Sequence, residues 1–96
     1  MGAGRKRVHV YISGKVQGVF FRAKTRSEAI RNNVMGWVRN IPDGRVEAVF
    51  EGTPESVDHM VNWCRMGPGL AVVEHVETSD EPYSGAFTDF NIRYWN

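Results

Sequence analysis

The chain has 96 residues, which is the length of one domain with a single hydrophobic core. Its twelve basic and eleven acidic residues leave a formal charge of +1, a balance that does not favour a nucleic-acid partner or a membrane surface. The one cysteine, Cys64, excludes an intramolecular disulfide and a cysteine metal cage. No apolar run reaches membrane-spanning length and no signal-peptide pattern is present, so we expect a cytoplasmic protein.

The first third of the chain predicts a strand, a glycine-containing turn and a helix. We expect residues 1–6 to form a flexible basic tail and residues 7–96 to form one domain. Apolar and polar side chains alternate over residues 8–13, which is typical of a half-buried strand. A helix is predicted over about residues 21–32, with an inner stripe at four-residue spacing. That stripe is Phe21, Thr25 and Ala29.

The middle of the chain predicts a hairpin and a second helix. Strands over residues 34–40 and 45–52 are joined by Ile41–Gly44, whose Pro-Asp-Gly sequence is typical of a tight connection. Thr53 followed by Pro54 is a typical helix start. An apolar stripe at helical spacing follows, and it consists of Val57, Met60, Val61 and Cys64.

The last third predicts a strand over residues 71–78, a loop over 79–88 and a final short strand over 90–94. The element order is therefore β-α-β-β-α-β plus a short C-terminal strand. This order is typical of an α+β protein with a ferredoxin-like α/β sandwich. We expect an antiparallel sheet with two helices on one face.

The turn Gly14–Arg22 is the strongest candidate for a binding site. Successive N–H groups of a strand-to-helix turn can point into one concavity, and the helix N-terminus adds partial positive charge. Arg22 falls at the helix start, where its planar guanidinium can bind two phosphate oxygens. The stretch is neither a P-loop nor a dinucleotide-binding fingerprint, so a nucleotide is not the expected ligand. An ordinary turn with a surface arginine is the plain alternative.

Three stretches of the sequence resemble the acylphosphatase family. Ile12–Arg22 is similar to the phosphate-loop signature of that family, and Gly36–Asn40 is similar to its second signature. The ending Phe90–Tyr94 is similar to the family's C-terminal strand. The resemblance extends over nearly the whole chain from about residue 7, and two long signatures in the right order make it specific.

The resemblance implies hydrolysis of the carboxyl–phosphate bond of acyl phosphates, without a metal or other cofactor. It implies that Arg22 binds the substrate and that Asn40 orients the attacking water. The phosphate would be held by the backbone amides of Lys15, Val16, Gln17, Gly18 and Val19. Inorganic phosphate is then expected as product and competitive inhibitor. Ile41 stands where many members carry threonine, which removes a polar side chain that could support Asn40.

The chemistry of these residue types fits that reaction. Phosphoryl transfer requires mainly positioning and charge stabilisation from the protein. Asn40 can hold a water through its donors and acceptor, but an amide cannot act as a general base at neutral pH. An acyl phosphate leaves as a carboxylate whose conjugate acid has a pKa of about 4, so no general acid is required. A phosphomonoester would require one, and we expect poor activity on such esters.

Two other functions are kept as alternatives. A non-catalytic phosphate- or anion-binding module would use the same loop without turnover. An RNA-binding ferredoxin-like domain is the least favoured, because the third strand lacks the aromatic pattern of those modules. The three histidines are scattered singly, which predicts no metal site. Cys64 and the three tryptophans are interpreted as packing residues.

Overall fold

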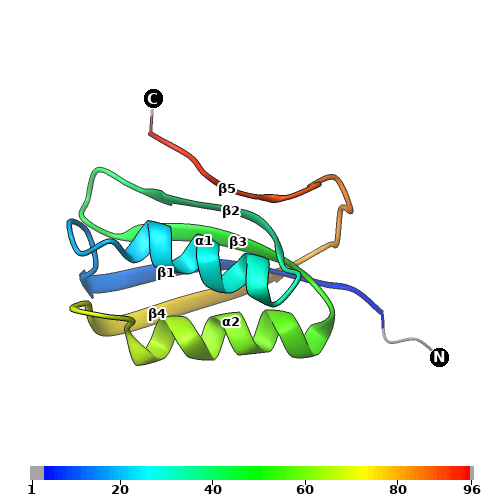
Figure 1. Ribbon diagram of the computed structural model, residues 1–96, viewed down its shortest axis with the longest axis horizontal. Helices are drawn as coiled ribbons and strands as arrows, with labels where there is room; N and C mark the ends of the chain where they lie inside the picture. Colours follow the sequence, from blue (N-terminus) through cyan, green and yellow to red (C-terminus); the bar gives the residue numbers. More distant parts are fainter. Residues whose placement is uncertain (1–3, 96) are drawn as a thin grey trace.

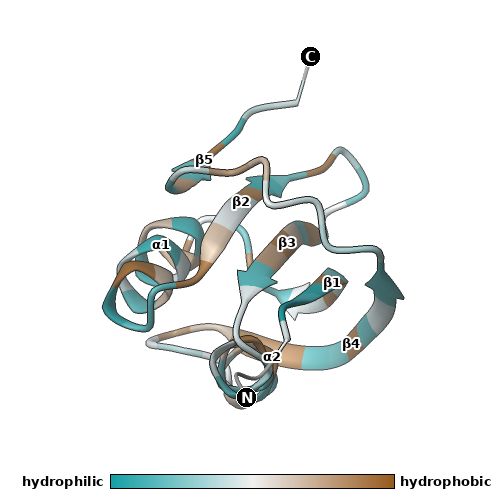
Figure 2. Cartoon of the chain, turned by 90° about the vertical axis from the view of Figure 1, so that its right-hand side faces the viewer, coloured by the Kyte–Doolittle hydropathy of each residue, from teal (hydrophilic) through white to brown (hydrophobic). Residues whose placement is uncertain are grey.

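The computed structural model describes residues 4–95, so residues 1–3 of the predicted tail lie outside the described part. The chain forms one open five-stranded sheet in the order β4-β1-β3-β2-β5. Both helices cover one face of that sheet (Figures 1 and 2), and the predicted α+β ferredoxin-like sandwich is confirmed. The elements are β1 (Lys6–Lys15), α1 (Phe21–Arg31), β2 (Met35–Asn40), β3 (Val46–Gly52), α2 (Pro54–Met66), β4 (Val72–Glu81) and β5 (Phe90–Ile92).

The sheet is mixed, and the expectation of a fully antiparallel sheet was wrong in this respect. The three other strand pairs are antiparallel, but β5 pairs with β2 in parallel. After β4 the chain reverses direction and crosses to the opposite edge of the sheet (Figure 2). There β2 already runs in the same direction, so the last strand adds to it in parallel.

The sheet begins at Lys6, which the sequence analysis assigned to the flexible tail. Lys6 is the first residue of β1 and pairs with Gly52, and its ammonium lies 2.8 Å from the carboxylate of Asp58. The guanidinium of Arg7 binds Glu81 at 2.8 Å and Glu51 at 3.2 Å. These acidic partners come from elements far away in sequence, which explains why the basic run gave the impression of a solvated tail.

The core lies between the sheet and the two helices. The predicted alternation in β1 is confirmed, because Val8, Val10 and Ile12 are buried. All three residues of the predicted α1 stripe are buried as well, and α2 buries Val57, Met60 and Cys64. Burial raises the pKa of the Cys64 thiol to about 12, so this cysteine is a packing residue as expected.

The sheet face opposite the helices is held together by polar side-chain contacts. His9 places its two ring nitrogens 2.6 Å from Glu47 and 2.8 Å from Glu81. Burial acts to raise the pKa of Glu47, but hydrogen bonds from Arg39 and His9 outweigh it and keep that pKa below its ordinary value. No helix within residues 4–95 is long and apolar enough to cross a membrane.

Candidate active site

Two stretches that are distant in sequence meet at one end of the sheet. Strands β1 and β2 are both antiparallel to β3, which lies between them, so they run parallel to each other. Their C-terminal ends therefore lie at the same end of the sheet. The loop over residues 16–20 follows β1, and Asn40 is the last residue of β2. Figure 1 shows this loop and the β2–β3 hairpin together at the left of the molecule.

Arg22 and Asn40 line the same cavity. This cavity has a volume of about 250 Å³, and the loop, the first turn of α1, the end of β2 and the C-terminal segment surround it. A neighbouring hollow of about 360 Å³ is again lined by Arg22 and Asn40, together with Tyr94. The structure thus brings together the two residues that the sequence predicted as catalytic.

Three residues from the end of β1 to the start of α1 have a positive φ, and Gly14 and Phe20 flank the loop. Gly14 has a φ of 129°, and a Cβ there would lie 2.2 Å from the carbonyl oxygen of Val72 in β4. Only glycine allows β1 and β4 to approach so closely at this point. Phe20, directly before α1, has a φ of 61°, in the left-handed region that side chains rarely adopt.

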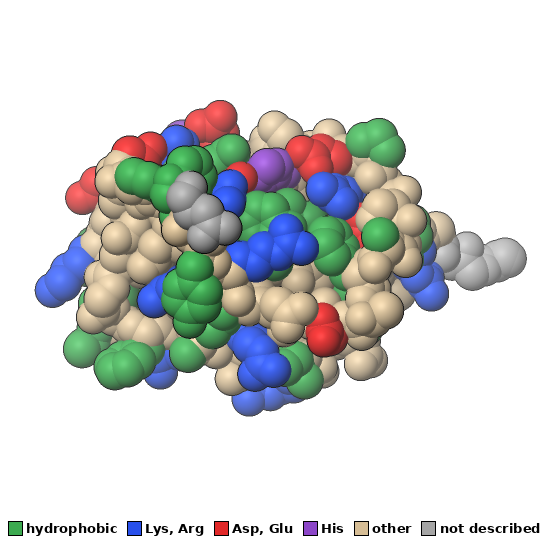
Figure 3. All heavy atoms as spheres, turned by 90° about the horizontal axis from the view of Figure 1, so that it is seen from above, with side chains coloured by type: hydrophobic (Ala, Val, Ile, Leu, Met, Phe, Trp, Pro, Cys, Tyr) green, Lys and Arg blue, Asp and Glu red, His purple; other side chains and the backbone are tan. Residues whose placement is uncertain are grey.

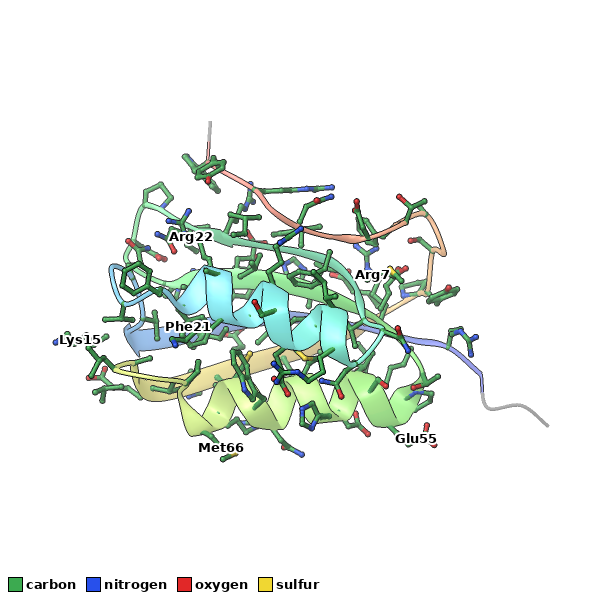
Figure 4. All side chains as sticks on the ribbon, viewed as in Figure 1. Arg7, Lys15, Phe21, Arg22, Glu55 and Met66 are labelled. Atoms are coloured by element: carbon green, nitrogen blue, oxygen red, sulfur yellow. The ribbon has the colours of Figure 1, made fainter. Side chains whose placement is uncertain are left out.

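The predicted cradle residues occupy different environments. Val16 and Val19 are buried and anchor the loop to the core, whereas Lys15 and Gly18 are exposed. Figure 4 shows the Lys15 side chain directed away from the body of the molecule. In the described part of the chain, the amides of residues 16–19 donate to no other protein group. A run of free amides beside a buried wall is the arrangement that binds an oxyanion.

The N-terminus of α1 adds to this arrangement. Phe20 provides no side-chain cap, and the first turn contains no acidic residue. The first N–H groups of a helix have no partner inside the helix, and they carry the positive end of its dipole. The open end of α1 therefore borders the same cavity as Val16 and Gly18, two of the loop residues whose amides have no protein partner.

Arg22 differs from the arginines that are tied up in ion pairs. Arg7, Arg31, Arg39 and Arg45 each bind a carboxylate. Within residues 4–95 no carboxylate pairs with Arg22, whose guanidinium lies 5.4 Å from the ring centroid of Tyr94. Figure 4 shows Arg22 on the side of α1 that faces the C-terminal segment. A half-buried arginine held by an aromatic ring keeps its donors available for an anion.

Asn40 contains an unusual acceptor. Its Oδ1 is buried and has no hydrogen-bond partner among the described residues. A buried acceptor without a partner costs about 1–3 kcal/mol, so such atoms are rare unless they have a function. Asn40 also lines the cavity that contains Arg22, which places this unpartnered acceptor beside the candidate site.

Sequence reasoning missed two side chains at this site. Gln17 was predicted only through its backbone amide, yet its side-chain Nε2 donates to the carbonyl oxygens of Ile41 and Arg45, both at 2.9 Å. Tyr94 was expected in the last strand, but β5 ends at Ile92 and leaves Tyr94 against Arg22. No local pattern marks either contact, because the partners lie more than twenty residues away.

The C-terminal segment also covers part of the neighbouring sheet face. The guanidinium of Arg39 lies 4.7 Å from the ring centroid of Trp95. Arg93 stacks in the same way on Trp37 and Phe87. Figure 3 looks onto this side of the molecule and shows basic side chains interleaved with hydrophobic ones. Of the three predicted packing tryptophans, Trp37 is buried, while Trp95 is 54% exposed and packs only on the surface.

The described residues include no group of three or more histidine, cysteine or acidic side chains placed to hold a metal ion. The polar side chains that line the cavity are the guanidinium of Arg22, the amide of Asn40 and the phenol of Tyr94, among apolar neighbours such as Phe21 and Ile92. This is a donor-rich, positively charged set that suits an anion. Independence of metals and cofactors stays a prediction, which an assay in EDTA can test.

The fold and this cavity define a small ferredoxin-like α+β protein with a candidate oxyanion site between a strand–helix loop and a hairpin. The sequence model described as "Acylphosphatase" matches residues 8–92, and the chain belongs to the acylphosphatase family. An acylphosphatase of Syntrophus aciditrophicus is 61% identical over 89 residues, which cover 93% of each chain. One of Rubrobacter xylanophilus is 60% identical over 92% of this chain and 80% of its own.

A solved structure agrees with this assignment. The structure of an acylphosphatase from Coxiella burnetii superposes with a TM-score of 0.88 at 37% identity, and 93% of each chain is covered. The resemblance inferred from the two signatures is therefore confirmed at the level of the family and of the fold.

Proposed function

We propose that this protein is an acylphosphatase that hydrolyses acyl phosphates to a carboxylate and inorganic phosphate. The observation that carries the proposal is the pairing, in one cavity, of an arginine without a carboxylate partner and a buried amide oxygen without a donor. One group suits the phosphate and the other suits a water. The family assignment supports this activity.

The phosphate is held by the free amides of residues 16–19, the open end of α1 and the guanidinium of Arg22. These donors are fixed before the substrate arrives, because the buried side chains of Val16 and Val19 anchor the loop. Fixed donors directed at the oxygens of the phosphoryl group stabilise the charge that these oxygens carry in the transition state. Inorganic phosphate fits the same donors and acts as a competitive inhibitor.

Asn40 orients the attacking water. Its Oδ1 accepts one hydrogen of the water, which turns an oxygen lone pair toward the phosphorus. The water proton passes to an oxygen of the substrate phosphate, since the cavity lining contains no carboxylate or imidazole. The P–O bond to the acyl group breaks, and the carboxylate leaves without protonation because its conjugate acid has a pKa of about 4.

The test is metal-free hydrolysis of benzoyl phosphate in EDTA by wild type, Arg22→Ala and Asn40→Ala, with phosphate binding measured by calorimetry. Asn40→Ala is expected to lose at least about 100-fold in kcat while it still binds phosphate. Arg22→Ala is expected to lose both binding and turnover. Arg31→Ala is the matched control, because Arg31 is a surface arginine at the far end of the same helix.

Two outcomes would favour the other functions. A wild-type protein that binds phosphate without turnover would be a non-catalytic anion-binding module. One that does neither but binds single-stranded RNA would be the RNA-binding alternative. A cytoplasmic location also stays a prediction, which fractionation of the source cells would test.

A further inference from the structure

The side chain of Gln17 bridges the two halves of the candidate active site. Gln17 lies in the loop between β1 and α1, and its Nε2 is 2.9 Å from the carbonyl oxygen of Ile41 and 2.9 Å from that of Arg45. An amide nitrogen carries two hydrogens, so both are used by these two bonds. The half-buried side chain thus joins the loop to both sides of the turn between β2 and β3.

The two accepting carbonyls are also the ones that close this turn. The N–H of Ile41 donates to the Arg45 oxygen at 3.0 Å, and the N–H of Gly44 donates to the Ile41 oxygen at 3.1 Å. Each carbonyl therefore accepts two hydrogen bonds, which is its full capacity. The tip between them, residues 42–44, is exposed and has little packing of its own.

Asn40 directly precedes this turn. Its backbone pairs with Val46 in the ladder between β2 and β3, and its side chain lines the cavity opposite the loop. The distance between the phosphate cradle and Asn40 therefore depends on how the turn sits on the loop. The side chain of Ile41 is apolar and cannot hold the turn against the loop by a hydrogen bond. Its backbone carbonyl can, because it accepts the hydrogen bond from Gln17.

We propose that Gln17 is a positioning residue. Its side chain sets the distance and the orientation between the phosphate bound by the loop and the water bound by Asn40. The inference rests on the proposed acylphosphatase activity. The Gln17 side chain, unlike its backbone amide, contacts neither the phosphate nor the water. It fixes the hairpin so that the amide of Asn40 points at the line of attack, and a misplacement of about 1 Å there can cost about 100-fold in rate.

The experiment compares wild type with Gln17→Ala and Gln17→Glu in the benzoyl phosphate assay. Both variants keep the backbone amides, and kcat is expected to fall by about 30- to 100-fold in each. In Gln17→Ala, which adds no charge beside the phosphate, the inhibition constant of inorganic phosphate is expected to change less than about threefold. Gln17→Glu places a carboxylate against two carbonyl oxygens and is expected to be the slower variant at neutral pH. A purely structural defect would lower the amount of folded protein and would leave kcat per folded molecule unchanged.

A double-variant measurement connects the effect to Asn40. In an Asn40→Ala background, Gln17→Ala is expected to cause no further loss of kcat, because the water is no longer held. Asn32→Ala is the matched control, since the Asn32 side chain also donates to a backbone carbonyl at 2.8 Å, at the other end of α1. It is expected to lower thermal stability and to leave kcat unchanged.

The outcomes separate this inference from the function on which it rests. Wild type without turnover would overturn the acylphosphatase proposal itself. An active wild type with full kcat in both Gln17 variants would overturn only the positioning role. Additive losses in Gln17→Ala/Asn40→Ala, or a phosphate inhibition constant that rises in Gln17→Ala as much as kcat falls, would also contradict it.

Discussion

The two helices begin in opposite ways. Helix α2 is capped by its own sequence: the Thr53 hydroxyl accepts from the N–H of Ser56, Pro54 occupies the first position and Glu55 lies in the first turn. Helix α1 has no side-chain cap and no acid, and its second residue is Arg22. The chain runs in opposite directions through the two helices, so these N-termini lie at opposite ends of the molecule (Figure 1).

The difference between the two helix starts shows how a helix N-terminus can be left open for a ligand. An acid near a helix N-terminus stabilises the helix, and an arginine there does not. Helix α2 uses this stabilisation for folding. Helix α1 lacks this stabilisation. The positive end of its dipole has no acidic neighbour in the first turn and remains free for the anion that we propose as substrate. The first turn of α1 is therefore less stable than the same turn would be with a capping residue and an acidic residue.

The largest expected effect comes from exchanging the charges at the second position of each helix. Arg22→Glu is expected to lower kcat/KM by at least about 1,000-fold, because a carboxylate replaces the phosphate-binding guanidinium. The same change should raise the free energy of unfolding by about 0.5 kcal/mol, since it supplies the missing acid. Steady-state kinetics and urea unfolding measure the two effects.

Glu55→Arg is the matched variant on α2. It is expected to lower the free energy of unfolding by about 0.5 kcal/mol and to leave kcat/KM unchanged. If Arg22→Glu and Glu55→Arg lost activity to the same extent, the difference in charge between the two helix N-termini would have no role in function.

The next effect concerns the turn that leads into α1. Gly14→Ala is expected to lower the free energy of unfolding by about 3 kcal/mol, because its Cβ would collide with the backbone of Val72 and Glu74. Gly18→Ala, in the loop that follows β1, is the control. Its φ is 74° but no atom lies within 4 Å of an added Cβ, so only about 1 kcal/mol of backbone strain is expected. Equal costs in urea unfolding would show that strand approach at Gly14 does not matter.

A smaller effect is expected at the cap of α2. Thr53→Ala removes the acceptor for Ser56 and is expected to lower the free energy of unfolding by about 1 kcal/mol. The inhibition constant of inorganic phosphate and kcat should stay at their wild-type values, because this helix end is remote from the cavity. A change in either constant would mean that α2 takes part in the site.

The smallest effect is expected at the thiol on the buried face of α2. Burial raises the pKa of Cys64 to about 12, so at pH 8 the thiolate that reacts with alkylating reagents is nearly absent. Iodoacetamide is expected to leave the native enzyme active and to label Cys64 only after unfolding in urea. Loss of activity in step with labelling of the native protein would contradict this packing role.

Local sequence patterns were sufficient to predict most of the helices and strands. Alternation identified β1, Pro-Asp-Gly chemistry identified the hairpin, and Thr53 with Pro54 identified the start of α2. The glycine-punctuated loop ending in Arg22 pointed to an anion site, and the resemblance added Asn40. These signals can be read from sequence because they depend on neighbours within a few residues, where propensity and periodicity act.

Only the tertiary structure decided which distant groups meet. The parallel pairing of β5, the ion pairs of Lys6 and Arg7, and the contact of Tyr94 with Arg22 depend on how the sheet edges are filled. The clearest case is Gln17, whose sequence position suggests a backbone amide in a phosphate loop. Its side chain donates to carbonyls 24 and 28 residues further along the chain. Such contacts arise because β3 places β1 and β2 in parallel, and no local pattern records that arrangement.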